Sequence, residues 1–143
     1  MIEDEITDLQ EEHAALASIV YAPADRPASV PPAQCPAILL RAGPYALTPA
    51  ARSVTGETQA IEGLVMISGP AEGIALDQAY DLARTVRGEL VTLYKELISG
   101  PASLESSEAV VIGYTDPGDP GQLVEYEGQQ YIGFTFTVQL WRP

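Results

Sequence analysis

The chain has 143 residues, 46% of them hydrophobic, and carries 20 acidic against 7 basic side chains, which gives a net charge of -13. This length and composition predict one folded domain, because a chain of this size buries roughly 70% of the surface that it exposes when unfolded. The negative charge argues against binding to DNA phosphates or to anionic membranes, since both need clustered lysine and arginine.

The N-terminal segment is predicted to form an amphipathic helix over residues 2–20. Its apolar stripe has helical spacing and comprises Ile2, Ile6, Leu9, His13, Leu16 and Val20. The opposite face, predicted to meet solvent, carries Glu3, Asp4, Glu5, Asp8, Glu11 and Glu12. This acidic beginning lacks the basic start and apolar stretch of a secretory signal, so we expect the chain to be made and kept in the cytoplasm.

Residues 22–60 are predicted to form proline-rich loops around one short strand at 37–41. The stretch "APADRPASVPPAQCP" contains five prolines, which exclude a helix or an interior strand. "AILLR" is short, apolar and bounded by Pro36 and by Gly43-Pro44, as a buried strand would be. Residues 42–60 are expected to form a long loop or mobile arm with some extended structure.

The middle of the chain predicts a strand followed by a long helix. "IEGLVMISG" at 61–69 is the strand, in which Gly63 is expected to mark a bulge. "IALDQAYDLARTVRGELVTLYKELISG" has a helical apolar stripe and ends at Gly100-Pro101. Gly88 inside this helix is expected to allow close packing on a sheet.

The last third of the chain predicts three strands. "AVVIGYT" at 109–115 and "QLVEYE" are separated by a doubled Asp-Pro-Gly and are expected to form a hairpin over 109–126. Gly128 marks a tight turn before the final strand, 131–141. Alternation in that strand puts Ile132, Phe134, Phe136, Val138 and Leu140 on one face, and Tyr131, Thr135, Thr137, Gln139 and Trp141 on the other.

The predicted fold class is therefore α+β, with a mostly antiparallel sheet packed against two helices, a long loop or arm, and a C-terminal hairpin. All of residues 1–143 are assigned to a single domain. No stretch reaches the 18 apolar residues of a membrane-spanning helix, so no membrane association is expected.

No catalytic, cofactor-binding or metal-binding motif is found, and no enzyme activity and no cofactor are expected. His13 is interpreted as a structural residue of the first helix, although a nucleophilic pair with Cys35 is an alternative. Because Cys35 is the only cysteine, neither an intrachain disulfide nor a cysteine-rich zinc site is expected. A calcium site is a further alternative to simple turn formation for four acidic residues, namely Asp116, Asp119, Glu125 and Glu127.

The order of these parts resembles the tail terminator proteins of long-tailed bacteriophages, including minor tail and head–tail joining proteins. The similar pieces are the N-terminal helix, "PAILLR" after a proline-rich lead, "IEGLVMISG" before the helix "DQAYDLARTVRGEL", and the closing "VVIGYTDPGDPGQLVEYEGQQYIGFTFTVQLWRP". The likeness covers most of residues 2–142, and 42–60 has no clear counterpart.

The resemblance implies a structural virion protein at the head-proximal end of the tail. Such proteins form a ring, usually of six subunits, that caps the tail tube and joins it to the head-side connector or neck protein. DNA would pass through the lumen without specific binding. The resemblance leaves open whether the tail is contractile, and a tail tube or neck adaptor subunit is the main alternative. A small ligand-binding or enzymatic domain is a third reading.

Ring contacts are expected from the segment 42–60 and the 109–126 hairpin, because exposed edge strands and projecting hairpins can pair between subunits. The candidate subunit or partner contacts are Tyr45, Arg52, Tyr114, Asp116, Asp119, Tyr126, Tyr131 and Trp141.

Overall fold

The computed structural model describes residues 2–23, 25–51, 54–68, 76–100, 109–118 and 122–142. In chain order the elements are α1 (Ile2–Ala14), a 3₁₀ turn η1 (Pro32–Gln34), β1 (Ala37–Ala51), β2 (Val54–Ser68), α2 (Leu76–Ser99), β3 (Val110–Thr115), β4 (Gln122–Tyr126) and β5 (Gln129–Arg142).

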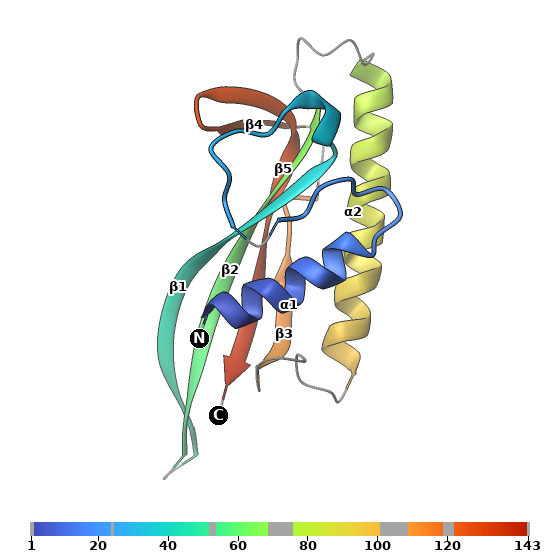
Figure 1. Ribbon diagram of the computed structural model, residues 1–143. Helices are drawn as coiled ribbons and strands as arrows, with labels where there is room; N and C mark the ends of the chain where they lie inside the picture. The colour runs from blue at the N-terminus through green and yellow to red at the C-terminus, as the bar shows by residue number, and fades with distance from the viewer. Residues whose placement is uncertain are drawn as a thin grey trace.

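The five strands form one open antiparallel sheet in the order β1-β2-β5-β3, and β4 pairs with the beginning of β5 (Figure 1). Both helices contribute to one core with the sheet, which confirms the α+β class. The period-two pattern of β5 is also confirmed, because the side chains from Ile132 to Leu140 at alternate positions are all buried in that core.

Among the described residues, a second apolar cluster forms at one end of the opposite face of the sheet. It lies between the strands and the segment 25–36, which we call the strap. Its buried members are Val30, Ala37, Leu39, Met66, Tyr126 and Tyr131. The proline-rich composition of the strap suits this role, because a fixed, extended backbone can lie across side chains without pairing to the sheet.

Helix α1 is shorter than the spacing predicts. It ends at Ala14, and the chain then closes with hydrogen bonds from Ala15 N–H to Glu12 O and from Leu16 N–H to His13 O. Val20 is 63% exposed and is not part of the apolar stripe. The reason is a competing interaction: the N–H groups of residues 20 and 21 both donate to the carbonyl of Pro36, at the start of β1.

The prediction that all the acidic residues of α1 meet solvent is wrong for two of them. Glu5 is 1% exposed and Asp8 is also buried. Arg142, at the end of β5, donates to Glu5 at 2.9 Å and lies 3.1 Å from the Glu57 carboxylate on β2. Burial raises the pKa of the Glu5 carboxyl above its usual value, although Arg142 acts in the opposite direction. The last strand thus holds the first helix through a partly buried ion pair.

The loop expected at 42–60 is instead a long antiparallel pair of strands. β1 continues to Ala51 and pairs with β2, with register shifts at Ala42/Tyr45 and at Pro49/Ala51. The prediction of a loop rests on the prolines and glycines of this segment. A strand tolerates them here, because Pro44 falls within the first register shift and Pro49 lies in an edge strand, where a missing N–H is accepted.

Two glycine predictions are also corrected. Gly63 pairs in regular register and marks no bulge, and a side chain there would collide with the ring of Phe136. The missing side chain at Gly63 therefore leaves room for the aromatic ring of Phe136 in the core. Gly88 lies on the exposed side of α2, with no other atom within 4 Å of the place where its Cβ would be, so it packs against no sheet.

The expected 109–126 hairpin does not form. β3 and β4 both pair with β5, at opposite ends of that strand, and not with each other. The C-terminal hairpin is β4–β5, with Glu127 and Gly128 as its two turn residues, both at positive φ (50° and 79°). Positive φ at both positions is what a type I′ two-residue hairpin turn requires, so the turn at Gly128 is confirmed.

Candidate interaction surfaces

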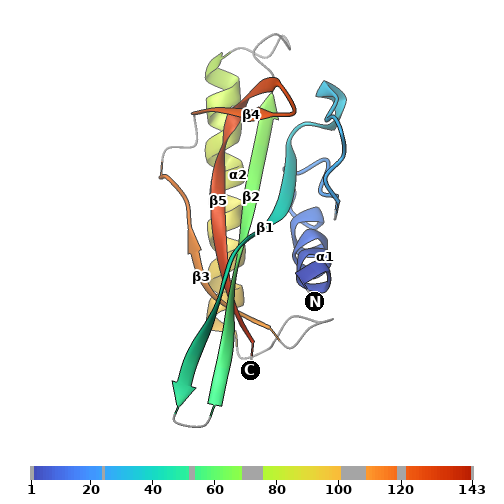
Figure 2. The same cartoon turned by 90° about the vertical axis from the view of Figure 1, so that its left-hand side faces the viewer.

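The far end of the β1–β2 hairpin projects beyond the rest of the sheet (Figures 1 and 2). The last row shared with β5 pairs Glu57 with Arg142, and beyond it β1 and β2 pair only with each other. We call this part, residues 48–51 and 54–56, the arm. A two-stranded ribbon alone is marginally stable in water, so the arm gains most from contact with another molecule. Tyr45 lies just before the arm, in register with Gln59.

Two of the predicted contact residues, Tyr114 and Asp116, lie together at the end of β3. The Tyr114 hydroxyl donates to Asp116 at 3.0 Å, and Arg87 on α2 donates through Nε to both carboxylate oxygens, each at 3.0 Å. Gly118 N–H also donates to Asp116 at 2.8 Å. The first Asp-Pro-Gly is therefore a turn that α2 holds in place, and its carboxylate is engaged within the chain.

A chain of three aromatic side chains connects this turn to α1. The Tyr114 ring stacks on Tyr94 of α2 with centroids 4.9 Å apart, and the Tyr94 hydroxyl is hydrogen-bonded to His13 Nε2 at 2.6 Å. Burial raises the pKa of both tyrosines, and Asp116 adds to the rise at Tyr114. His13 is fully buried, in agreement with a structural role. Its Nδ1 has no hydrogen-bond partner among the described residues.

This environment makes a prediction about pH. Burial lowers the pKa of His13 from 6.5 to about 3, so below pH 6.5 the unfolded chain binds a proton that the folded chain excludes. As the pH is lowered from 6.5 toward about 3, the free energy of unfolding should therefore fall by about 1.4 kcal/mol per pH unit. Glu5 works in the opposite direction, because its raised pKa lets the folded chain take up a proton first.

The test compares the wild-type chain with His13→Gln, which can still hydrogen-bond to Tyr94 but does not titrate. Urea unfolding at about pH 7 and about pH 5 should show the larger loss of stability in the wild-type chain. Equal losses in the two chains would show that the buried imidazole does not control acid stability.

Tyr126 and Tyr131, also predicted as contacts, are used to hold the strap. Their hydroxyls donate to the carbonyls of Pro27 and Val30, the second at 3.1 Å. The guanidinium of Arg26 lies over the Tyr126 ring, 5.3 Å from its centre. The two tyrosines therefore stabilise the strap, and as contacts with a partner they stay predictions.

Three further residues predicted as contacts are Trp141, Arg52 and Asp119. Trp141 is partly buried near the end of β5, in register with Thr58 on one side and Val110 on the other. Arg52 and Asp119 lie outside the described residues. Ile112, which the sequence reading missed, is 51% exposed on the edge strand β3. Its only signal in the sequence is the uncharged, proline-free stretch "VVIGYT".

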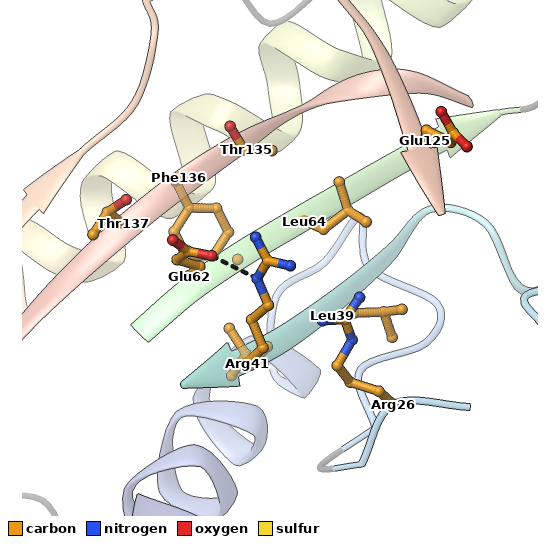
Figure 3. A pocket seen from close by; sticks show the side chains of 11 residues that line it. Arg26, Leu39, Arg41, Glu62, Leu64, Glu125, Thr135, Phe136 and Thr137 are labelled. Atoms are coloured by element: carbon orange, nitrogen blue, oxygen red, sulfur yellow. Dashed lines mark hydrogen bonds and ion pairs between the residues drawn. The ribbon is translucent and has the colours of Figure 1, made fainter. Parts of the chain in front are cut away.

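A shallow pocket of about 240 Å³ lies on the face of the sheet opposite the helices, beside the strap (Figure 3). Leu39 and Leu64 form part of its apolar floor. Arg41 is ion-paired with Glu62 at its edge. Its polar lining consists of Arg26, Arg41, Glu62, Glu125, Thr135 and Thr137.

This pocket is small and is lined by both charged and apolar side chains. It is smaller than typical small-molecule sites of roughly 300–1,000 Å³. Its lining holds two arginines and two glutamates, and a glutamate carboxylate is able to act as a general base. Within the described parts of the chain, no three histidine, cysteine, aspartate or glutamate side chains lie close enough to hold a metal ion.

Comparison with known proteins adds no relative: no family model matches the chain, and no curated protein matches it. In the described ranges, neither α1 nor α2 is both long and apolar enough to cross a bilayer.

Proposed function

We propose that this chain is a structural virion protein of the tail terminator kind, which forms a ring on the tail tube and joins it to the head-side connector. The proposal starts from the resemblance in the order of the sequence elements. The observation that carries it is the arm, a ribbon that extends past the sheet and, among the described residues, pairs with no third strand. A ring of identical subunits needs such a surface, because each subunit must contact its neighbour through two different patches.

The charge of the chain supports a DNA-conducting role. At -13 per subunit, a ring repels phosphates and would let the genome pass without binding to it. Part of this charge is carried by the exposed side of α1, at Glu3, Asp4, Glu11 and Glu12.

The same charge also opposes assembly. Repulsion between subunits is screened over about 8–10 Å at physiological ionic strength. Ring formation should therefore be stronger at raised salt or with Mg²⁺ than at low salt.

The test is native mass measurement together with negative-stain imaging of the purified chain, at low and raised salt and with Mg²⁺. A closed ring of about six subunits, as the resemblance implies, that becomes more abundant with screening is the expected result. Long helical tubes would instead assign the chain to the tail tube. A chain that stays monomeric in every condition would contradict self-assembly and turn attention to the pocket beside the strap.

A further inference from the structure

The outer edge of β3 lacks the usual protection of an edge strand. The sheet order places β3 at one end, and no described strand pairs with its outer side. Edge strands of monomeric proteins usually carry charges or prolines that prevent pairing with other chains. The six residues from Val110 to Thr115 contain neither.

Ile112 exposes an apolar side chain on this edge. The register with β5 shifts between Val111 and Gly113, so Ile112 is the extra residue of a bulge and has no partner on β5. Its exposed fraction is 51%. An uncharged strand with an exposed isoleucine is a surface suited to pairing with another strand.

The opposite edge of the sheet, on β1, offers a short complementary stretch. Ile38 N–H donates outward to Tyr21 O at 3.0 Å, so the edge is occupied at that point. Backbone groups alternate in direction along a strand, so those of Leu40 and Ala42 also point outward. The register shift that contains Pro44 ends this free stretch, because proline has no N–H to donate.

The two edges lie at the same level of the sheet. Across the ladders, Thr115 is in row with Thr137, Glu62 and Arg41, and Tyr114 is in row with Val138, Ile61 and Ala42. The path has four strands, each antiparallel to the next, so β1 and β3 run in opposite directions. A second copy turned about an axis along the strands would therefore bring its β1 antiparallel to β3.

We infer that the outer edge of β3 binds the outer edge of β1 of a second copy of this chain, as antiparallel strands. Strand direction would then keep alternating from one copy to the next, so the copies would form one continuous antiparallel sheet. The contact joins two different edges, so it repeats from copy to copy and forms a ring when the rotation between copies closes. The inference rests on the proposed function only in requiring that copies associate.

The first test is Ile112→Lys, which places a charge on the edge where it does not disturb the core. The matched control is Ile98→Lys on α2, where the isoleucine is 42% exposed on a helix and not on a strand edge. We expect Ile112→Lys to weaken association about tenfold or more in sedimentation experiments. Both variants should keep the thermal stability of the wild-type monomer.

The second test is cross-linking of Ile112→Cys with Ala42→Cys in a Cys35→Ser background. Within one chain Ala42 is in row with Tyr114, three strand spacings or about 14 Å away, and Ile112 lies two residues further along β3, so the separation is at least that large. A bismaleimide with a shorter reach should therefore link only neighbouring copies. The double variant should give a ladder up to the size of the ring, and each single variant no product beyond a dimer.

The outcomes separate this inference from the proposed function. If Ile112→Lys assembles like the wild-type chain, or the assembled double variant gives no ladder, the edge contact is wrong while ring formation stands. If the wild-type chain does not associate in any condition, both are wrong. Loss of assembly in Ile98→Lys as well would show that any new charge disrupts the ring, which would also overturn the specific role of β3.

Discussion

Shortening the arm is expected to abolish ring assembly and leave the folded subunit intact. The change replaces residues 48–56 by Asn-Gly, so that Leu47 and Glu57, which face each other in the ladder, flank a two-residue turn. The removed part pairs with no other described strand of the chain. Its loss should therefore lower the melting temperature of the subunit by no more than a few degrees.

The measurement is the native mass of the shortened chain under the salt conditions in which the wild-type chain forms rings. Glu127→Asn is the matched control, because it puts Asn-Gly into the other hairpin turn and leaves the arm unchanged. Rings formed by the shortened chain would show that the arm is not a subunit contact. A folded monomer that also fails to cap tail tubes would support the proposed function.

Gly133→Ala is expected to cause the largest loss of stability from a single methyl group. Gly133 is buried in β5 opposite Met66, and a Cβ there would collide with the carbonyl group of Val65 in β2. The obstacle is backbone of the neighbouring strand, which is harder to displace than a flexible side chain, and it lies next to the register shift between Met66 and Ser68. We expect a loss of about 3 kcal/mol or more, a large part of the roughly 5–15 kcal/mol that stabilises a typical domain.

The matched control for this prediction is Gly88→Ala in α2. The site is exposed and open, and alanine favours the helix over glycine, so the variant should gain about 0.5–1 kcal/mol. Chemical denaturation of both variants gives the comparison. A cost below about 1 kcal/mol for Gly133→Ala would mean that β2 and β5 can separate locally more easily than their register indicates.

Four of the predicted contact residues are engaged in interactions within the chain. Tyr114, Asp116, Tyr126 and Tyr131 make hydrogen bonds that hold a turn and the strap. Three of these four residues are tyrosines, a residue type that is common at interfaces. The same property, an apolar ring with one polar atom, also suits them to link two segments of a single chain.

The amino-acid pattern by itself determined the helix α2, the turn at Gly128 and the buried face of β5. These features depend on neighbours in sequence: a period of 3.6, a two-residue turn, and a period of two over ten residues. The same local reasoning indicated the class of fold. It also placed His13 on the inner side of α1, since residue 13 falls on the stripe that contains Leu9.

Only the tertiary structure decided which strands pair and which charges are buried. The residues of β3 by themselves do not distinguish pairing with β4 from pairing with β5, because either partner fits the same alternation of buried and exposed side chains. Glu5 is read as a solvent residue until Arg142, far away in sequence, is placed beside it. Likewise, the segment after Arg41 becomes a strand because β2 supplies its partners, although its prolines and glycine favour a loop. Long-range pairing overrides local preference wherever it provides hydrogen bonds that the segment cannot make alone.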